Sequence, residues 1–126
     1  MLAAAVLLAK SPGAFANPAH LGAGVHHHLA LRSQTVMAGQ PERAVETVRN
    51  DSSAPDDVTL WFTLQTPCGI IWGDPTVRTV PPNGGIAKWR FKLPTQEGCV
   101  GRYVFTVQLR DPSGRDHDKG TFKATA

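Results

Sequence analysis

The sequence is poor in charged residues and lacks any long apolar run. Only 18% of its 126 residues are charged, and they leave a net charge of +3. A nucleic-acid-binding domain usually carries denser clusters of lysine and arginine, and a membrane-spanning helix needs roughly 20 consecutive apolar residues. The length suits one domain rather than two. We therefore expect one globular domain with no membrane span and no nucleic-acid partner.

Signatures of catalysis are also missing. The sequence has no Gly-x-Ser-x-Gly turn to present a serine nucleophile, and no glycine-rich phosphate or dinucleotide loop. Its glutamates, Glu42, Glu46 and Glu97, are not matched with a second carboxylate for general acid–base work. The sequence therefore predicts that the protein is not an enzyme.

The first residues have the features of an export signal. A short apolar run spans Leu2 to Ala9, and Ala14-Phe15-Ala16 fits the small-x-small rule of signal peptidases. The basic segment that normally precedes such a run is missing, as it would be in a sequence with a truncated start. We expect a signal peptide over residues 1–16, a flexible histidine-containing lead over 17–28 and a folded domain over 29–126. The product is then expected to be secreted, periplasmic or displayed at the cell surface.

Alternation of apolar and polar residues dominates the remainder of the chain. A first strand is expected to end at Gly39, and the clearest later segments are VTLWFTLQT from Val58, IAKWRFKL from Ile86 and GRYVFTVQLRD from Gly101. Each of these three places its apolar side chains on one face of a strand. Turn-forming residues separate the segments, and no helical pattern appears after the signal region. Because a sheet with one apolar face needs a second layer to cover it, we expect an all-β, two-sheet antiparallel sandwich.

Two stretches resemble known β-sandwich domains. GRYVFTVQLRD resembles the Gly-x-Tyr strand of immunoglobulin-like domains, in which a tyrosine, here Tyr103, hydrogen-bonds back to the preceding corner. The stretch from Ala38 to Gly69 is similar to bacterial surface domains of the cell-adhesion-related type in its spacing of glycine, valine, asparagine and leucine. The resemblance covers roughly residues 30–125 and implies an immunoglobulin-like antiparallel β-sandwich of about seven strands.

Cys68 and Cys99 are the two cysteines of the chain. If consecutive strands reverse direction, Cys68 lies at the exit of the third strand and Cys99 at the entry of the sixth. Both then fall at the same end of the sandwich, on strands that are neighbours in an immunoglobulin-like sheet. Antibody domains differ, because the second strand supplies the first cysteine there. An oxidising compartment favours pairing, so we predict a disulfide between Cys68 and Cys99.

Histidines and aspartates gather at the opposite end of the predicted sandwich. In an extended segment His26 and His28 point the same way, about 7 Å apart. The loop GRDHDKG, which contains Asp116 and His117, ends at the same edge of the fold. Two imidazoles on one face, together with His117 and a carboxylate, would suit zinc or copper. The alternative is that these side chains are simply solvated polar groups at a loop-rich end.

Periplasmic copper-binding β-sandwich proteins have similar histidines, one soon after the signal cleavage site and one before the last strand. The corresponding residues here are His20 and His117. The resemblance implies a copper site, but two features depart from that family. Pro18 has no amide proton for an amino-terminal chelate, and Met1 and Met37 are too few for a methionine-rich copper(I) site. The main expectation is therefore that no cofactor is bound, with copper or zinc as the alternative.

Trp61 and Trp72 are the candidates for a ligand platform. Trp61 points away from the apolar face of its strand. Trp72 lies in PCGIIWGDP, residues 67–75, which we expect to be a bent connection before a short strand over residues 76–80. A pair of exposed tryptophans can hold a sugar or an apolar partner. The alternative is that the connection folds over Trp61 and buries it in a small separate core.

These observations predict a secreted, non-catalytic β-sandwich protein. It is expected to act by binding or by structural interaction with an unknown protein or cell-surface partner. The alternative is an extracytoplasmic protein that binds copper or zinc through histidines at the end of the sandwich next to the amino-terminal lead.

Overall fold

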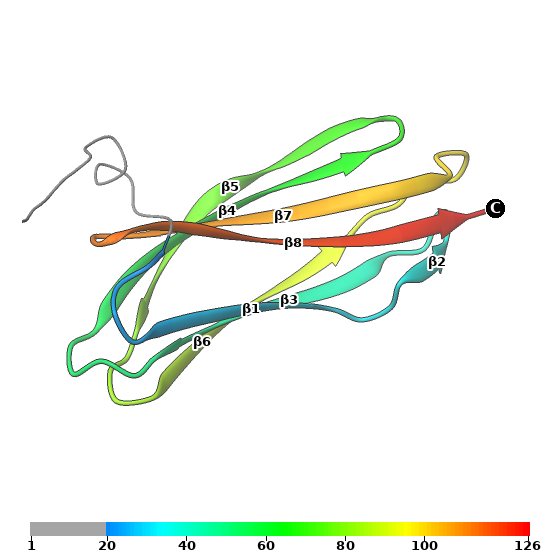
Figure 1. Ribbon diagram of the computed structural model, residues 1–126. Helices are drawn as coiled ribbons and strands as arrows, with labels where there is room; N and C mark the ends of the chain where they lie inside the picture. The colour runs from blue at the N-terminus through cyan, green and yellow to red at the C-terminus, as the bar shows by residue number, and fades with distance from the viewer. Residues whose placement is uncertain (1–19) are drawn as a thin grey trace, which may run out of the picture.

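The computed structural model describes residues 20–126, which form eight β-strands in two facing sheets (Figure 1). The strands are β1 (Val25–Leu31), β2 (Thr35–Met37), β3 (Glu42–Asn50), β4 (Asp56–Thr66), β5 (Gly69–Val80), β6 (Gly85–Leu93), β7 (Gly101–Asp111) and β8 (Gly114–Thr125). The predicted signal peptide over residues 1–16, and residues 17–19 of the predicted lead, lie outside the described residues. Between residues 20 and 126, no helix has the length and apolar character needed to cross a membrane.

The two sheets differ in size. The smaller sheet has the strand order β1-β3-β6, and the larger has the order β2-β8-β7-β4-β5. Neighbouring strands run antiparallel in both sheets, apart from the short parallel pair β2 and β8. The prediction of an all-β, two-sheet sandwich is confirmed, with eight strands.

The core lies between the sheets and follows from the period-two alternation of the strands. On β4 the side chains of Leu60 and Leu64 are buried, and on β6 Trp89 is only 4% exposed. The neighbours of Trp89, Lys88 and Arg90, are exposed, as the alternation predicts. Four consecutive inward side chains of β7 complete the centre of the core: Tyr103, Phe105, Val107 and Leu109.

Tyr103 anchors the corner that precedes β7. Its hydroxyl donates a hydrogen bond of 2.8 Å to the carbonyl oxygen of Cys99, and its side chain is 1% exposed. A buried tyrosine hydroxyl needs such a partner, so this contact fixes the direction in which the chain enters β7. The expected link between the tyrosine and its preceding corner is confirmed.

The structure corrects the expectation for residues 67–80. Instead of a bent connection and a short strand, β5 is one continuous strand that pairs with β4 in a hairpin. The pairing register shifts between Leu60 and Phe62, opposite Asp74 and Pro75. Proline has no amide hydrogen to donate to the ladder, and a bulge accommodates it without ending the strand.

The first expected strand, ending at Gly39, is divided between the two sheets. β1 begins at Val25, inside the predicted flexible lead, and belongs to the smaller sheet, whereas β2 joins the larger sheet. The backbone N–H of Ser33 donates a hydrogen bond of 3.0 Å to the buried carboxylate of Glu42 at this crossing. The burial of the Glu42 carboxylate is therefore explained by this hydrogen bond, which fixes the chain where it crosses from one sheet to the other.

Candidate functional site

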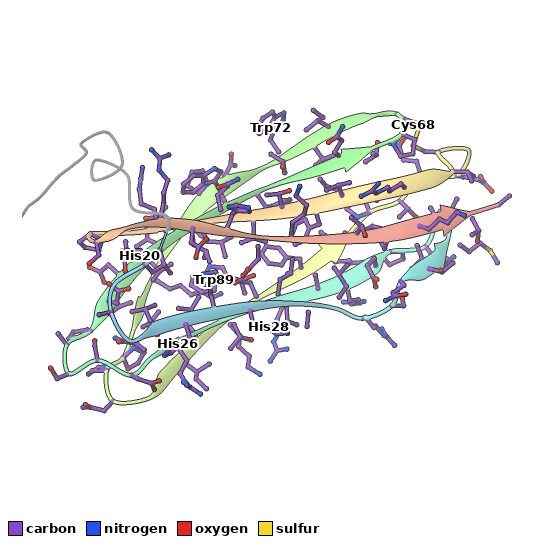
Figure 2. The ribbon with its side chains drawn as sticks, in the orientation of Figure 1. His20, His26, His28, Cys68, Trp72 and Trp89 are labelled. Carbon is purple, nitrogen blue, oxygen red and sulfur yellow. A yellow bond between two sulfur atoms is a disulfide. The ribbon has the colours of Figure 1, made fainter. Side chains whose placement is uncertain are left out.

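The predicted disulfide is present. Cys68 follows β4 and Cys99 precedes β7, and their Cα atoms lie 6.0 Å apart across the bond. β4 and β7 are neighbours in the larger sheet, which is why the two cysteines meet. Figure 2 shows Cys68 at the end of the sandwich away from the labelled histidines. The disulfide thus stabilises the end of the sandwich that lies away from the labelled histidines.

The structure places His26 and His28 on the outer side of β1 and His27 on the inner side. The exposure of β1 alternates, with His26 and His28 exposed and His27 partly buried. Leu29 and Leu31 share the inward face with His27. Burial of these apolar side chains decides which alternate residues of β1 face the core, so His27, which lies two residues before Leu29, faces inward as well.

The four residues expected to hold a metal do not come together. His26 Nε2 lies 3.3 Å from an Asp51 oxygen in a solvent-exposed contact, and His28 is exposed beside it on the same outer face. His117 is exposed on β8, in the other sheet, and its partner across the ladder is Gln108. The predicted set is incorrect in its geometry, because the histidines lie on opposite outer faces of the sandwich while Asp116 points inward.

A different group forms inside, which we call the histidine–carboxylate cluster: His27, Glu46, Asp116 and Asp118. The two ring nitrogens of His27 each contact an aspartate, with Nδ1 2.7 Å from an Asp118 oxygen and Nε2 2.8 Å from an Asp116 oxygen. Glu46 from β3 approaches from the buried side, with its Oε2 atom 3.8 Å from Nδ1. The cluster therefore joins the two sheets through polar contacts.

Burial and neighbouring charges shift the pKa values within the cluster. Burial acts to lower the pKa of His27, but hydrogen bonds to Asp118 and Asp116 outweigh it, and the pKa is raised. Burial would raise the pKa of Asp118, but its contacts with Glu46 and His27 outweigh this effect and lower it. Burial, followed by the proximity of Asp118, raises the pKa of Glu46 to about 10. These shifts favour the protonated form of His27 between two aspartates and the protonated form of Glu46 beside them.

A second feature is the outer face of β7 and β8, which we call the basic sheet face. Its outward cations are Arg102, Arg110, Arg115, Lys119 and Lys123, all of them exposed. In these two strands the acidic residues have the opposite parity: Asp111, Asp116 and Asp118 lie on the inner face. The outward side chains of residues 101–111 and 114–125 therefore include five cations and no carboxylate.

The acidic and basic residues of the chain are distributed unequally between interior and surface. Every lysine and arginine within residues 20–126 is exposed. Glu42, Glu46 and Asp111 are buried, and Asp116 and Asp118 turn inward. Because these carboxylates are withdrawn from the surface, the sheet faces present more positive potential than the formal charge of +3 suggests.

The tryptophans expected to form a platform lie on the same side as the basic sheet face. Trp61 on β4 pairs with Gln108 of β7, and the guanidinium of Arg110 lies 5.6 Å from its ring centroid. Trp72 is 72% exposed and projects outward from β5 (Figure 2). β5 lies beside β4 in the sheet as one extended strand, and Trp61 is partly buried.

The sequence matches no protein-family model and no curated protein. Solved structures with a similar fold include the Pseudomonas fluorescens alkylpurine DNA glycosylase AlkC bound to DNA containing an abasic site analog, with a TM-score of 0.57 and 18% identity over 83% of this chain. A beta-glucosidase from Listeria innocua in complex with glucose gives a TM-score of 0.54 and 15% identity over 81% of this chain. This chain spans 31% of the glycosylase and 16% of the glucosidase. At such identities the similarity shows the fold alone.

Proposed function

We propose that the protein is a secreted, non-catalytic β-sandwich that binds an anionic polysaccharide through its basic sheet face. The observation that carries the proposal is that five outward cations of β7 and β8, with no outward carboxylate between them, share their sheet face with Trp61 and Trp72. The outer face of β3 and β6 is also basic but carries no tryptophan. Alternate residues of a strand are separated by about 7 Å, and adjacent strands by about 4.8 Å. An extended polymer with regularly spaced negative groups is the complement of such a flat positive surface.

The two tryptophans favour a sugar polymer over a simple anion. Trp72 is exposed beside this surface, and Trp61 contacts Arg110 within it. Aromatic rings offer an apolar face with little conformational entropy to lose, and they suit the C–H faces of pyranose rings. The cations of β7 and β8 would attract the negative groups of the polymer, and the indole rings of Trp61 on β4 and Trp72 on β5 would stack on its sugar rings.

The expected compartment favours polysaccharide over nucleic acid as the polyanion. The features of an export signal at the start of the sequence and the Cys68–Cys99 disulfide both suit an extracytoplasmic protein. The DNA glycosylase among the similar structures offers no counter-argument, since its identity of 18% carries no ligand preference to this chain. In that compartment the protein would bind the cell surface through an acidic polysaccharide displayed on it.

The test is a binding assay with heparin and alginate as anionic probes and dextran as the neutral control. We expect both anionic polymers to bind, less tightly as salt is raised, and dextran not to bind. In the variant Arg102→Gln/Lys119→Gln/Lys123→Gln, three lost ion contacts of roughly 0.5–1 kcal/mol each weaken binding about 10- to 100-fold.

The matched control removes the same charge from the other sheet. The variant Lys88→Gln/Arg90→Gln/Lys92→Gln alters exposed residues of β6 and should bind the anionic polymers nearly as well as the wild type. Equal losses in both triple variants would mean that only net charge matters and would reject the basic sheet face. Tighter binding to double-stranded DNA than to either polysaccharide would replace this proposal with nucleic-acid binding.

A further inference from the structure

The histidine–carboxylate cluster lies at an open edge of the sandwich, between β1 and β8. β1 is an edge strand of the smaller sheet, and β2 covers β8 only at residues 123–125. The cluster is therefore partly accessible: the exposed fraction of the side chain is 14% for His27, 28% for Asp116 and 22% for Asp118. A small ion can reach the cluster from solvent by this edge.

Glu46 lies on the closed side of the cluster, and no N–H group among residues 20–126 donates to it. Its side chain is 0% exposed, and its polar contact is with the Asp118 carboxyl group, with which it shares a proton when no cation is bound. Its polar neighbours are His27 and the carboxylate of Asp118. A buried carboxylate without a donor is costly, and a bound cation is the group that would satisfy it together with the adjacent aspartate.

One nitrogen and two oxygens converge at this point. His27 Nδ1 and one oxygen each from Glu46 and Asp118 all lie within 4.8 Å of one another. Zinc bonds of about 2.0–2.2 Å to nitrogen and oxygen place tetrahedral ligand atoms about 3.3–3.6 Å apart. Each separation in the cluster therefore has to change by less than about 1.5 Å for the three atoms to share one ion.

We propose that His27, Glu46 and Asp118 bind one divalent ion of the zinc class, and that Asp116 orients His27 for this role. Metal binding releases to solvent the protons held at Nδ1 of His27 and at the Glu46 carboxyl group. Nε2 of His27 keeps its proton and donates it to Asp116 over 2.8 Å. Metal-bound histidines usually donate their second ring N–H to a carboxylate in this way. The set of one imidazole and two carboxylates favours zinc over calcium, which takes oxygen ligands, and over copper(I), which takes sulfur.

The ion would connect the two layers of the sandwich. Its ligands come from β1 and β3 of the smaller sheet and from β8 of the larger sheet. Three protein ligands leave a fourth position of a tetrahedral ion for water from the open edge. The role assigned to the metal is therefore a link between the two sheets. Two of its ligands, His27 and Asp118, are 91 residues apart in the sequence.

Calorimetric titration of the untagged, chelator-treated protein with ZnCl2 at about pH 7.5 tests this site. We expect one ion to bind per chain and the affinity to fall at least about 100-fold in Glu46→Gln, which keeps the shape of the side chain but cannot ionise to a carboxylate ligand. Asp116→Asn should weaken binding about 10- to 100-fold, as loss of an orienting partner does elsewhere. The matched control, His26→Ala/His28→Ala, alters exposed histidines of the same strand and should leave zinc affinity unchanged.

Circular dichroism establishes that each variant is folded, and Asp118→Asn replaces Glu46→Gln if the latter fails to fold. The site is rejected if ZnCl2 does not bind to the wild type, as expected if Glu46 and Asp118 only share a proton. Wild-type affinity in both Glu46→Gln and Asp118→Asn also rejects it. Loss of binding in the His26→Ala/His28→Ala control would mean that surface histidines capture the ion. Tighter binding of CaCl2 than of ZnCl2 would overturn the assignment of metal class.

Discussion

Replacing Trp89 with alanine removes the largest side chain that joins β6 to the larger sheet. The indole is 4% exposed, its Nε1–H donates to the Thr76 hydroxyl over 3.1 Å, and the guanidinium of Arg78 lies 5.1 Å from its ring centroid. Truncating a buried tryptophan costs roughly 3–5 kcal/mol through lost transfer energy and the cavity left behind. The hydrogen bond to Thr76 adds about 0.5–1.5 kcal/mol. A total loss of about 3.5–6.5 kcal/mol would remove much of the stability of a domain of this size.

The assay is urea unfolding followed by far-ultraviolet circular dichroism, with Lys88→Ala and Lys92→Ala as matched controls on the same strand. Both lysines are exposed, so each change should cost less than about 0.5 kcal/mol. The midpoint for Trp89→Ala should fall sharply, or the variant should not fold. A cost below about 1 kcal/mol, or equal costs for the three variants, would mean that β6 does not present Trp89 to the core.

Three further predictions follow from the disulfide, the interior cluster and the exposed tryptophan. The pKa of Glu46 is raised from 4.5 to about 10, so between these pH values the folded state holds a proton that the unfolded state releases. The free energy of unfolding, measured by urea titration in excess chelator, should therefore fall as pH rises through this range. Glu46→Gln should flatten this dependence, and an unchanged pH profile in the variant would contradict the burial of this carboxyl group. Reduction of the Cys68–Cys99 bond should lower the free energy of unfolding by roughly 3–4 kcal/mol on the chain-entropy model, and two alkylatable thiols in the denatured, unreduced protein would refute the bond. Trp72→Ala should leave the melting temperature unchanged, because the side chain is 72% exposed, while weakening alginate binding; unaltered alginate affinity would exclude a stacking role.

The alternation of apolar residues allowed the core strands to be predicted from the sequence. In β4 and β7 every second side chain is apolar, and burial of Leu60, Leu64, Phe105 and Val107 follows the predicted faces. The disulfide was also predictable, since strand direction alone brings the ends of β4 and β7 together. Both inferences rest on local periodicity and on neighbours within one sheet.

β5 was not predictable as one strand because its pattern is interrupted. Gly73, Asp74 and Pro75 together signal a turn, and most of the strand is exposed, with no alternation between buried and exposed side chains. Pairing with β4 overrides these local signals. The ladder accommodates these residues in a bulge of β5, where Asp74 and Pro75 lie opposite the single β4 residue between Leu60 and Phe62.

The histidine–carboxylate cluster was missed although the sequence contained part of the signal. His27 has the same parity as Leu29 and Leu31, which predicts an inward position for His27 and outward positions for His26 and His28. The contact between His27 and Asp118 could not be inferred in the same way, because it crosses from one sheet to the other. Alternation reveals which face a side chain occupies, whereas the relative placement of two sheets depends on the packing of the whole core.

The most direct measurement of the proposed polysaccharide binding is an NMR titration of the isotope-labelled protein with a heparin-derived oligosaccharide. The predicted result is that backbone amide shifts concentrate on β7 and β8, next to Arg102, Lys119 and Lys123, and extend to the indole N–H signals of Trp61 and Trp72. Shifts confined to β3 and β6, whose outer face is also basic, would contradict the account, as would the absence of any shift at low salt.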